Sequence, residues 1–243
     1  MSSVEFKKVY MKYAGAGDYS LEDISFSVNK GETVGIIGST GCGKTTLVSL
    51  IPGFYPAAEG EVLVDGKNVT KYDPVVLKNK VGFCFQHYYM FKGTILENVA
   101  FGNPAATEED IKEALKLAQG LDFVMEKREG LYDRVSEKGT NLSGGQKQRL
   151  MIARALVRKP EILILDDSSS ALDYATDRRL REALKALKDM TVFIVSQRTA
   201  SVLHADKILV LEDGKLVGVG THEELLKNNS VYREIYESCT KEQ

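Results

Sequence analysis

Hydrophobic and polar residues alternate along the first 30 residues of the chain. The alternation runs through VEFKKVYMKY and YSLEDISFSV, with the turn residues Gly15, Gly17 and Asp18 between the two stretches. Alternation with a period of two, interrupted by turn residues, predicts antiparallel strands.

Further apolar patterns predict a series of strands and helices. Short continuous apolar runs predict strands buried on both faces at 33–37, 162–165 and 191–195. Other strands are expected at 60–64, 81–85, 208–211 and 215–219, the last two flanking the hairpin signal Glu212-Asp213-Gly214. Helical periodicity predicts helices at 44–50, 111–118 and 173–187, and after Ser143, Thr221 and Ser230.

This order of elements predicts an α/β fold with a largely parallel sheet that is covered on both faces. We expect a single domain over residues 1–243, assembled from lobes. An antiparallel β lobe covers about 1–30, the parallel core covers 31–92 and 158–243, and a helical lobe covers 93–157.

Composition narrows the possible functions. Hydrophobic residues make up 43% and charged residues 27% of the chain, which is an ordinary globular balance, and the net charge of −2 gives no electrostatic reason to expect nucleic acid as the main partner. No secretory signal is visible, and no stretch approaches the roughly 18 apolar residues that span a bilayer. The scattered cysteines, Cys42, Cys84 and Cys239, are expected to be free thiols in a reducing compartment.

A glycine-rich loop follows the predicted strand at 33–37. It fits the pattern G-x-x-x-x-G-K-[ST] in the residues Gly38, Ser39, Thr40, Gly41, Cys42, Gly43, Lys44 and Thr45. Glycines let successive backbone N–H groups point at phosphate oxygens, and the following helix adds its positive end. Lys44 can neutralise the β- and γ-phosphates of ATP, and the Thr45 hydroxyl can coordinate Mg²⁺. We include Thr46 among the expected nucleotide contacts.

Two further segments carry chemistry of the same kind. The buried strand at 162–165 ends in Asp166-Asp167, and Asp166 is a candidate carboxylate for Mg²⁺. Leu142-Ser143-Gly144-Gly145-Gln146 opens a helix, with Ser143 as a good N-cap and exposed backbone N–H groups at Gly144 and Gly145. One nucleotide is not easily held by two separate helix ends of one chain. A dimer that clamps each nucleotide between the loop of one chain and the helix end of the other is the simplest arrangement.

With these motifs in this order, the whole chain resembles the ABC ATPase family. The resemblance implies a P-loop NTPase fold, with a RecA-like parallel core, an N-terminal antiparallel β layer and an inserted helical lobe that carries the signature motif. In the family's terms, 38–45 is the Walker A loop, 162–166 is Walker B and 142–146 is the signature. Gln86 resembles the glutamine of the Q-loop, which senses Mg²⁺, and 170–173 resembles the D-loop at the dimer interface. Tyr13 lies where the family stacks an aromatic ring on adenine, and a ring face suits a purine face.

Two stretches resemble the exporter subgroup. Phe91 to Val99 is similar to the segment after the exporter Q-loop, and Arg134 to Gly139 is similar to the exporter x-loop. The resemblance implies that both meet the transmembrane domains of an exporter, and that this domain is itself soluble and works at the cytoplasmic face of the cell membrane. A chain that starts directly at the ATPase favours a domain cut from a longer polypeptide.

The sequence departs from the family pattern at two catalytic positions. Asp167 stands where the family usually has glutamate, and its side chain is one methylene shorter; a misplacement of about 1 Å can cost roughly 100-fold in rate. Gln197 stands at the position of the switch histidine, and its amide cannot take up a proton. His204 and His222 lie downstream and are expected to be surface residues.

The combination of these two departures with a complete signature resembles one half of a heterodimeric exporter. We expect a catalytically weak site built on Asp167, Gln197 and Gln86, with the residues 142–146 completing the hydrolytic site of a non-identical ATPase partner. Three alternatives stay open at this point. A soluble ABC protein of DNA repair or translation should bind nucleic acid in a salt-sensitive manner, and a nucleotide-sensing module should show no useful turnover. A nucleotide kinase would not explain the signature.

Overall fold

The computed structural model describes residues 2–86, 89–168 and 171–241. The strands are β1 Ser2–Met11, β2 Leu21–Asn29, β3 Thr33–Ile37, β4 Glu59–Val64, β5 Lys67–Asn68, β6 Val81–Cys84, β7 Gly93–Thr94, β8 Arg134–Val135, β9 Ile162–Asp166, β10 Thr191–Val195, β11 Lys207–Glu212 and β12 Lys215–Gly220. The α-helices are α1 Lys44–Ser49, α2 Pro74–Lys80, α3 Ile95–Ala100, α4 Glu108–Leu117, α5 Leu121–Met125, α6 Gly144–Leu156, α7 Tyr174–Lys185, α8 His222–Asn228 and α9 Ser230–Lys241. Short 3₁₀ turns are η1 Val69–Lys71, η2 Gly130–Tyr132, η3 Glu137–Gly139 and η4 Thr199–Ser201.

A mostly parallel sheet forms the centre of the molecule, as the apolar runs predict. Its strand order is β12-β11-β3-β10-β9-β6, and only the edge strand β12 pairs in the antiparallel sense among the described residues. Successive residues of its strands pack into two different apolar cores, as Leu163 and Ile164 of β9 do. Both faces of the sheet are therefore buried, which explains why its strands are continuously apolar.

One core lies between the parallel sheet and a second, antiparallel sheet. This second sheet has the order β2-β1-β4-β5, and the core includes Phe6 of β1, Ile24 of β2 and Leu47 of α1. The strands β4 and β5 fall within the stretch 31–92, which the sequence pattern placed with the parallel core. That part of the lobe assignment is wrong for these two strands, because alternation predicts a strand but not its partner, and β4 pairs with β1 through Phe6 and Val62.

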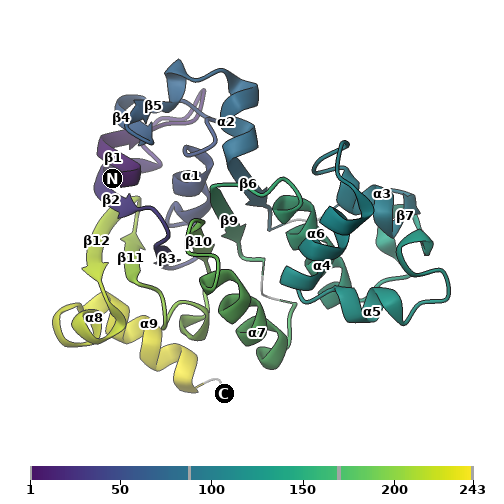
Figure 1. Cartoon of the computed structure of the whole chain (residues 1–243). Helices are drawn as coiled ribbons and strands as arrows, with labels where there is room; N and C mark the ends of the chain where they lie inside the picture. The colour runs from purple at the N-terminus through teal and green to yellow at the C-terminus, as the bar shows by residue number, and fades with distance from the viewer. Residues whose placement is uncertain (1, 87–88, 169–170, 242–243) are drawn as a thin grey trace.

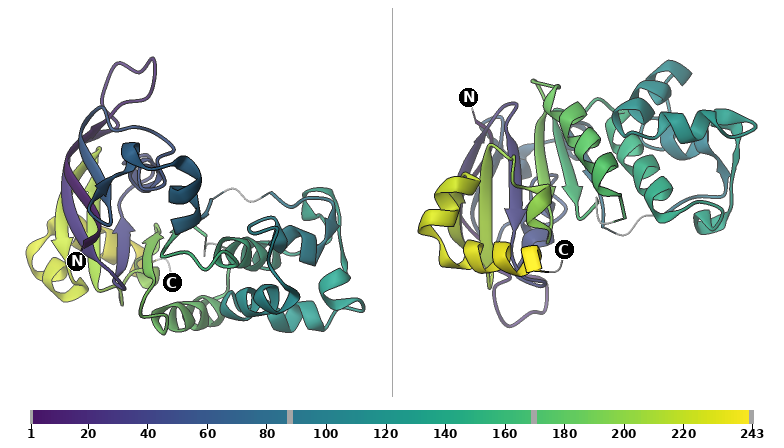
Figure 2. Two further views of the ribbon diagram at one scale, coloured as in Figure 1. Left: turned by 45° about the horizontal axis from the view of Figure 1, so that its top comes forward. Right: turned by 90° about the horizontal axis from the view of Figure 1, so that it is seen from below.

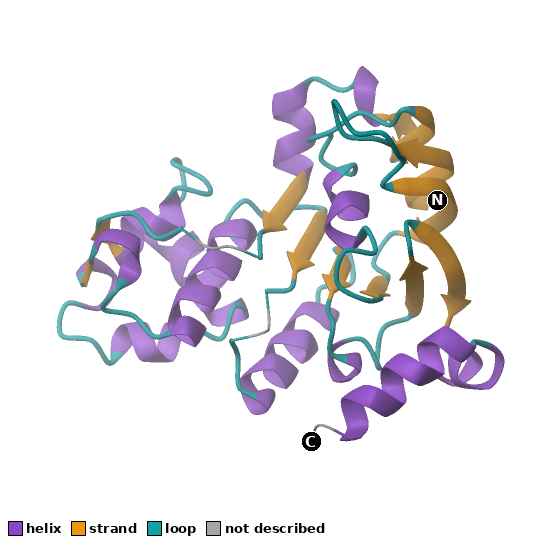
Figure 3. Cartoon of the chain, turned by 180° about the vertical axis from the view of Figure 1, so that it is seen from behind, coloured by secondary structure: helices purple, strands orange, loops and turns teal. Residues whose placement is uncertain are grey.

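The other core joins the parallel sheet to the helices α4, α6, α7, α8 and α9. Figure 1 and Figure 2 show the helices α3 to α6 projecting beside β6 and β9, while α8 and α9 lie under β11 and β12. Figure 3 separates the strand-rich part of the molecule from this helical lobe. The small pair β7–β8, which we did not predict, closes the lobe where Gly93 pairs with Val135. Within the described residues, we find no helix both long and apolar enough to cross a bilayer.

Helix starts follow their capping residues. Ser143 and Thr107 form capping boxes with Gln146 and Asp110, and these boxes begin α6 and α4. The helix predicted at 111–118 therefore starts three residues earlier, because the capping box at Thr107 satisfies the free N–H groups of the first turn.

The central sheet generates a stability prediction. Ile164 of β9 is fully buried, so Ile164→Ala should lower the free energy of unfolding by about 2–5 kcal/mol. Val217 of β12 is 39% exposed, and Val217→Ala should change the free energy by about 0.5 kcal/mol or less. Urea unfolding followed by circular dichroism measures both values. Equal effects of the two substitutions would contradict the placement of β9 at the centre of the sheet.

Candidate nucleotide-binding site

The glycine-rich loop 38–43 connects the end of β3 to the start of α1. A Cβ atom at Gly38 would lie 2.2 Å from the carbonyl oxygen of Leu211, so only glycine fits against the neighbouring strand. Gly43 has a φ of 101° and caps α1, a conformation that favours glycine. The loop thus bends sharply at the carboxyl edge of the sheet and leads directly into the helix.

Lys44 lies inside this loop rather than in solvent. Its side chain is buried, and Nζ donates to the carbonyl oxygens of Gly38 at 2.8 Å and Ser39 at 2.7 Å. Cys42 Sγ lies 3.7 Å away. The ammonium group is therefore held at the centre of the loop, where a bound phosphate would meet it.

Asp166 and Thr45 meet at the end of β9. The Thr45 hydroxyl donates to Asp166 Oδ1 at 3.1 Å, and Asp166 is only 2% exposed. Burial raises the pKa of Asp166, and the Thr45 hydrogen bond opposes this rise. A desolvated carboxylate beside a hydroxyl is a pair of oxygen ligands that suits Mg²⁺.

Asp167 and Gln86 form the next contact along this edge. Gln86 Nε2 donates to Asp167 Oδ2 at 3.3 Å, and the Asp167 amide donates to the carbonyl of Val195 at 3.0 Å. Asp167 has a φ of 46°, in the left-handed region that aspartate tolerates better than most residues. Burial raises the pKa of Asp167, and the Gln86 hydrogen bond opposes it.

Gln197 reaches the same place from the end of β10. The Thr40 hydroxyl of the glycine-rich loop lies 3.5 Å from Gln197 Oε1, the outer limit of a hydrogen bond. Sequence reasoning missed its buried neighbour Ser196, whose hydroxyl accepts from the Arg198 amide at 2.9 Å. The signal was available, because Ser196 directly continues the predicted strand at 191–195.

These groups surround one cavity of about 180 Å³. Its lining combines the loop with the ends of β6, β9 and β10, in the residues Thr40, Gly41, Gly43, Lys44, Thr45, Thr46, Gln86, Asp166, Asp167, Val195, Ser196 and Gln197. The structure thus brings together most of the residues that the motifs single out. Among the described residues there is no group of three or more His, Cys, Asp or Glu side chains that could hold a metal alone. A Mg²⁺ ion here would share its coordination with phosphate oxygens, as this ion usually does.

Tyr13 lies at the outer end of the site. Its hydroxyl is 3.0 Å from Thr46 Oγ1, and its ring meets Tyr55 edge to face with centroids 5.1 Å apart. The ring is 37% exposed, so part of it remains open to a planar ligand. The motif analysis missed Tyr55, which no pattern marks.

The signature residues stand apart from this cavity. Ser143 and Gln146 satisfy each other, with Ser143 Oγ accepting from the Gln146 amide at 3.2 Å and Gln146 Oε1 accepting from the Ser143 amide at 3.0 Å. Neither these two residues nor Gly144 and Gly145 line the cavity. In the segment predicted to lie at a dimer interface, Ser170 falls outside the described residues, and the Ala171 amide donates to Gln148 Oε1 at 3.0 Å.

The two described histidines, His204 and His222, lie outside the cavity. His204 is exposed, as predicted. His222 is only partly exposed, and its Nδ1 lies 2.8 Å from the hydroxyl of the fully buried Tyr232. His222 therefore lies only partly at the surface, because α9 packs Tyr232 against it. The cysteines are free thiols, as predicted.

Comparisons with known proteins agree with this geometry. A family model described as ABC transporter matches residues 21–170. A protein of Bacillus subtilis named for multidrug export as an ATP-binding/permease protein is 45% identical over 96% of this chain, and one of Staphylococcus aureus with the same description is 45% identical over 89%. A bacterial Atm1-family ABC exporter with ATP bound superposes with a TM-score of 0.93 at 34% identity over 98% of this chain. This chain spans 40%, 38% and 42% of those three proteins.

The buried carboxylate of Asp166 generates a prediction about pH. Because its folded pKa is raised, the charged form is disfavoured in the native state, and this penalty appears as the pH rises through the folded pKa. Asp166→Asn keeps an oxygen acceptor for Thr45 and removes the charge. In metal-free buffer it should raise the thermal midpoint more at pH 7.5 than at pH 4.5.

Asp173 provides a control for this measurement. Hydrogen bonds from Thr176 lower its pKa below the ordinary value, so its contribution to stability is present at both pH values and is lost only as the pH falls further, through the lowered pKa; Asp173→Asn should therefore cost a similar amount of stability at pH 7.5 and at pH 4.5. A pH-independent effect of Asp166→Asn would contradict the desolvation of that carboxylate.

Proposed function

This chain belongs to the ABC transporter family as an ATP-binding domain, and we propose that it is a motor domain of an exporter whose own catalytic side turns ATP over slowly. The proposal of slow turnover is supported mainly by the two residues at positions 167 and 197, at the carboxyl edge of the sheet. Aspartate at 167 and glutamine at 197 occupy positions where the resemblance leads us to expect glutamate and histidine. The remaining parts of the proposal follow from how the surrounding residues are held.

ATP would bind with its phosphates in the loop 38–45 and its adenine near Tyr13. Lys44 would exchange the carbonyl oxygens of Gly38 and Ser39 for phosphate oxygens, and the backbone N–H groups at the start of α1 would add to the attraction. Thr45 and Asp166 would hold Mg²⁺, with Gln86 close by in the cavity lining. The ion would neutralise charge on the phosphates, and catalysis would depend mainly on positioning.

Slow hydrolysis follows from what Asp167 and Gln197 can do. The Asp167 carboxylate already accepts a hydrogen bond from Gln86, and its short side chain limits its reach toward a water on the phosphate. Gln197 can donate a hydrogen bond to the γ-phosphate, but its amide carries no titratable proton. A poorly oriented water and an uncharged switch residue both raise the barrier to transfer.

A second ATPase domain would complete each nucleotide site. Ser143, Gly144, Gly145 and Gln146 lie at the start of α6, away from this chain's own cavity, and their helix end is free to meet a nucleotide held elsewhere. The segment 142–146 keeps the whole signature motif, whereas positions 167 and 197 depart from the residues that the family usually has there. The proposed partner is therefore a non-identical subunit with an intact glutamate and histidine.

An aromatic surface on the helical lobe would receive the transmembrane domains at the cytoplasmic face of the membrane. Phe91 and Phe101 are 39% and 60% exposed, and their rings lie 4.7 Å apart. The guanidinium of Arg154 of α6 lies over both rings and donates to the backbone carbonyls of Asn98 and Tyr89. Exposed aromatic residues that are held this firmly are typical of interaction surfaces.

The other functional classes receive less support. The relatives are named for export, and the net charge of −2 offers no attraction for nucleic acid. A nucleotide kinase leaves the signature at 142–146 without a role.

Steady-state ATPase assays test the slow site. The unmodified chain with MgATP should turn over very slowly, and the double variant Asp167→Glu with Gln197→His should be faster by roughly 10- to 100-fold. Asp213→Glu is a matched control, because Asp213 also has a positive φ, 44°, but lies in the β11–β12 hairpin; it should leave the rate unchanged. Equal, brisk rates in the unmodified chain and the double variant would refute the proposal.

A further inference from the structure

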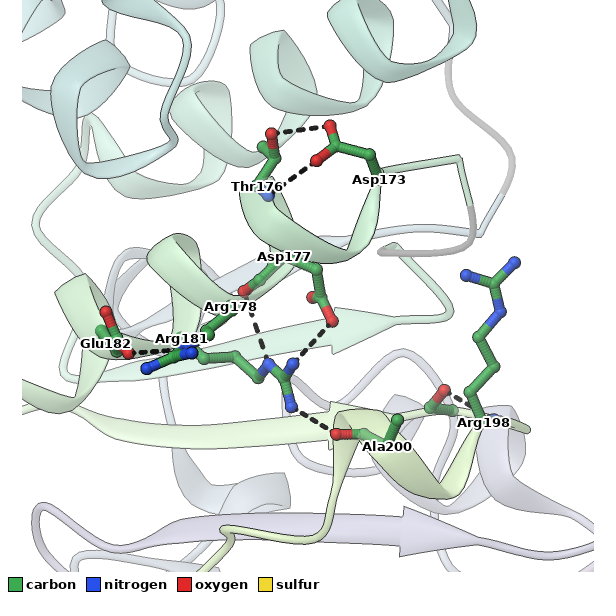
Figure 4. A network of polar contacts seen from close by, with 9 residues as sticks. Asp173, Thr176, Asp177, Arg178, Arg181, Glu182, Arg198 and Ala200 are labelled. Atoms are coloured by element: carbon green, nitrogen blue, oxygen red, sulfur yellow. Dashed lines mark hydrogen bonds and ion pairs between the residues drawn. The ribbon is translucent and has the colours of Figure 1, made fainter. Parts of the chain in front are cut away.

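A partly buried arginine connects α7 to the turn that follows Gln197. Arg181 lies in the middle of α7, and its NH2 group is 3.0 Å from Asp177 Oδ2, one helical turn earlier. Its NH1 group donates to the backbone carbonyl of Ala200, in the turn η4. Figure 4 shows the guanidinium lying between these two acceptors, with Asp177 on one side and Ala200 on the other. One side chain therefore ties two separate segments together.

We propose that Arg181 is a positioning residue that couples the γ-phosphate side of the nucleotide site to the start of α7, the segment that would face a partner ATPase. This inference rests on the proposed function, because it needs a nucleotide beside Gln197. Arg181 lines no part of the nucleotide cavity itself. It acts through the two segments that its side chain connects, the first turn of α7 and the turn η4.

The first end of the bridge leads to Gln197. Ala200 is three residues beyond Gln197, and the intervening backbone is fixed because the Arg198 amide donates to Ser196 Oγ at 2.9 Å and the Val202 amide donates to the Thr199 carbonyl at 2.9 Å. A shift of Gln197 toward a phosphate must therefore move Ala200, or break this short turn.

The second end of the bridge leads to the start of α7. Asp173 caps the helix by accepting from the Thr176 amide at 2.9 Å, and Asp177 donates its own amide to the Asp173 carbonyl at 3.0 Å. Thr176 and Asp177 are both buried, so this first turn packs as a rigid unit. The Asp177 carboxylate, which binds Arg181, thus belongs to the first turn of α7. This turn directly follows residues 171–173, the segment predicted to lie at the dimer interface.

The chemistry of the bridge requires arginine. A guanidinium presents several N–H donors in a fixed plane and can bind a carboxylate and a carbonyl at the same time, whereas a lysine ammonium has no fixed fork. The pair is also shielded, since the side chains of Arg181 and Asp177 are only 15% and 12% exposed. One residue further along the same helix, Arg178 and Glu182 form a pair with the same spacing at 2.9 Å, but their side chains are 68% and 61% exposed.

Hydrogen exchange with and without MgATP tests the coupling in the full chain. MgATP should slow amide exchange in the loop 38–46 and in 196–202, and also at 174–178 by about fivefold or more, a typical coupling between sites. Arg181→Met should abolish the effect at 174–178 and keep the effect at 38–46. Arg178→Met, on the same helix, should behave like the unmodified chain.

A purely structural role for Arg181 gives a different result. It would speed exchange at 174–178 equally with and without nucleotide, and the difference made by MgATP would persist. Arg181→Lys keeps the charge with a less disruptive change, and it should lose the nucleotide-dependent effect as Arg181→Met does, which keeps the test valid if the methionine variant folds poorly.

The outcomes separate this inference from the proposed function. Retained nucleotide protection at 174–178 in either Arg181 variant would overturn the coupling, and so would protection of 38–46 without any at 174–178 in the unmodified chain. If MgATP fails to protect 38–46 in the unmodified chain, the proposed nucleotide site itself fails.

Discussion

The parallel register of β3, β10 and β9 is the constraint on which the site depends. Val195 of β10 pairs with Ile36 of β3 on one side and with Asp166 of β9 on the other. Because the three strands end at the same edge, the segments that follow them must meet there. The glycine-rich loop lies more than a hundred residues in sequence from the two carboxylates and from Gln197, and the strand pairing brings all of them to one cavity.

Much of the fold was predictable from local pattern, because burial on both faces makes a strand apolar throughout. The runs at 33–37, 162–165 and 191–195 became β3, β9 and β10 for this reason. Strand partners were not predictable in the same way. β4 was expected as a strand but was assigned to the wrong layer, since its pairing with β1 depends on contacts between residues far apart in sequence.

The residues of the site also differ in how far the sequence predicted them. Lys44, Thr45 and Asp166 were identified from spacing, because phosphate and Mg²⁺ chemistry restricts the residue types at each position. Sequence gave no sign that Asp167 adopts a left-handed conformation or accepts a hydrogen bond from Gln86. Arg181 carries no motif at all; its partner Ala200 offers only a backbone carbonyl, and any residue could supply that group.

The position of Lys44 has a consequence for how the loop would bind an anion. Two carbonyl oxygens of the loop accept hydrogen bonds from its ammonium group, which is the group that would bind a phosphate. An incoming phosphate then competes with the protein's own oxygens, and only the difference between the two sets of hydrogen bonds contributes to affinity. The same lysine therefore ties the end of the loop to its beginning, and a chain lacking it would lose these two hydrogen bonds as well as the attraction for the ligand.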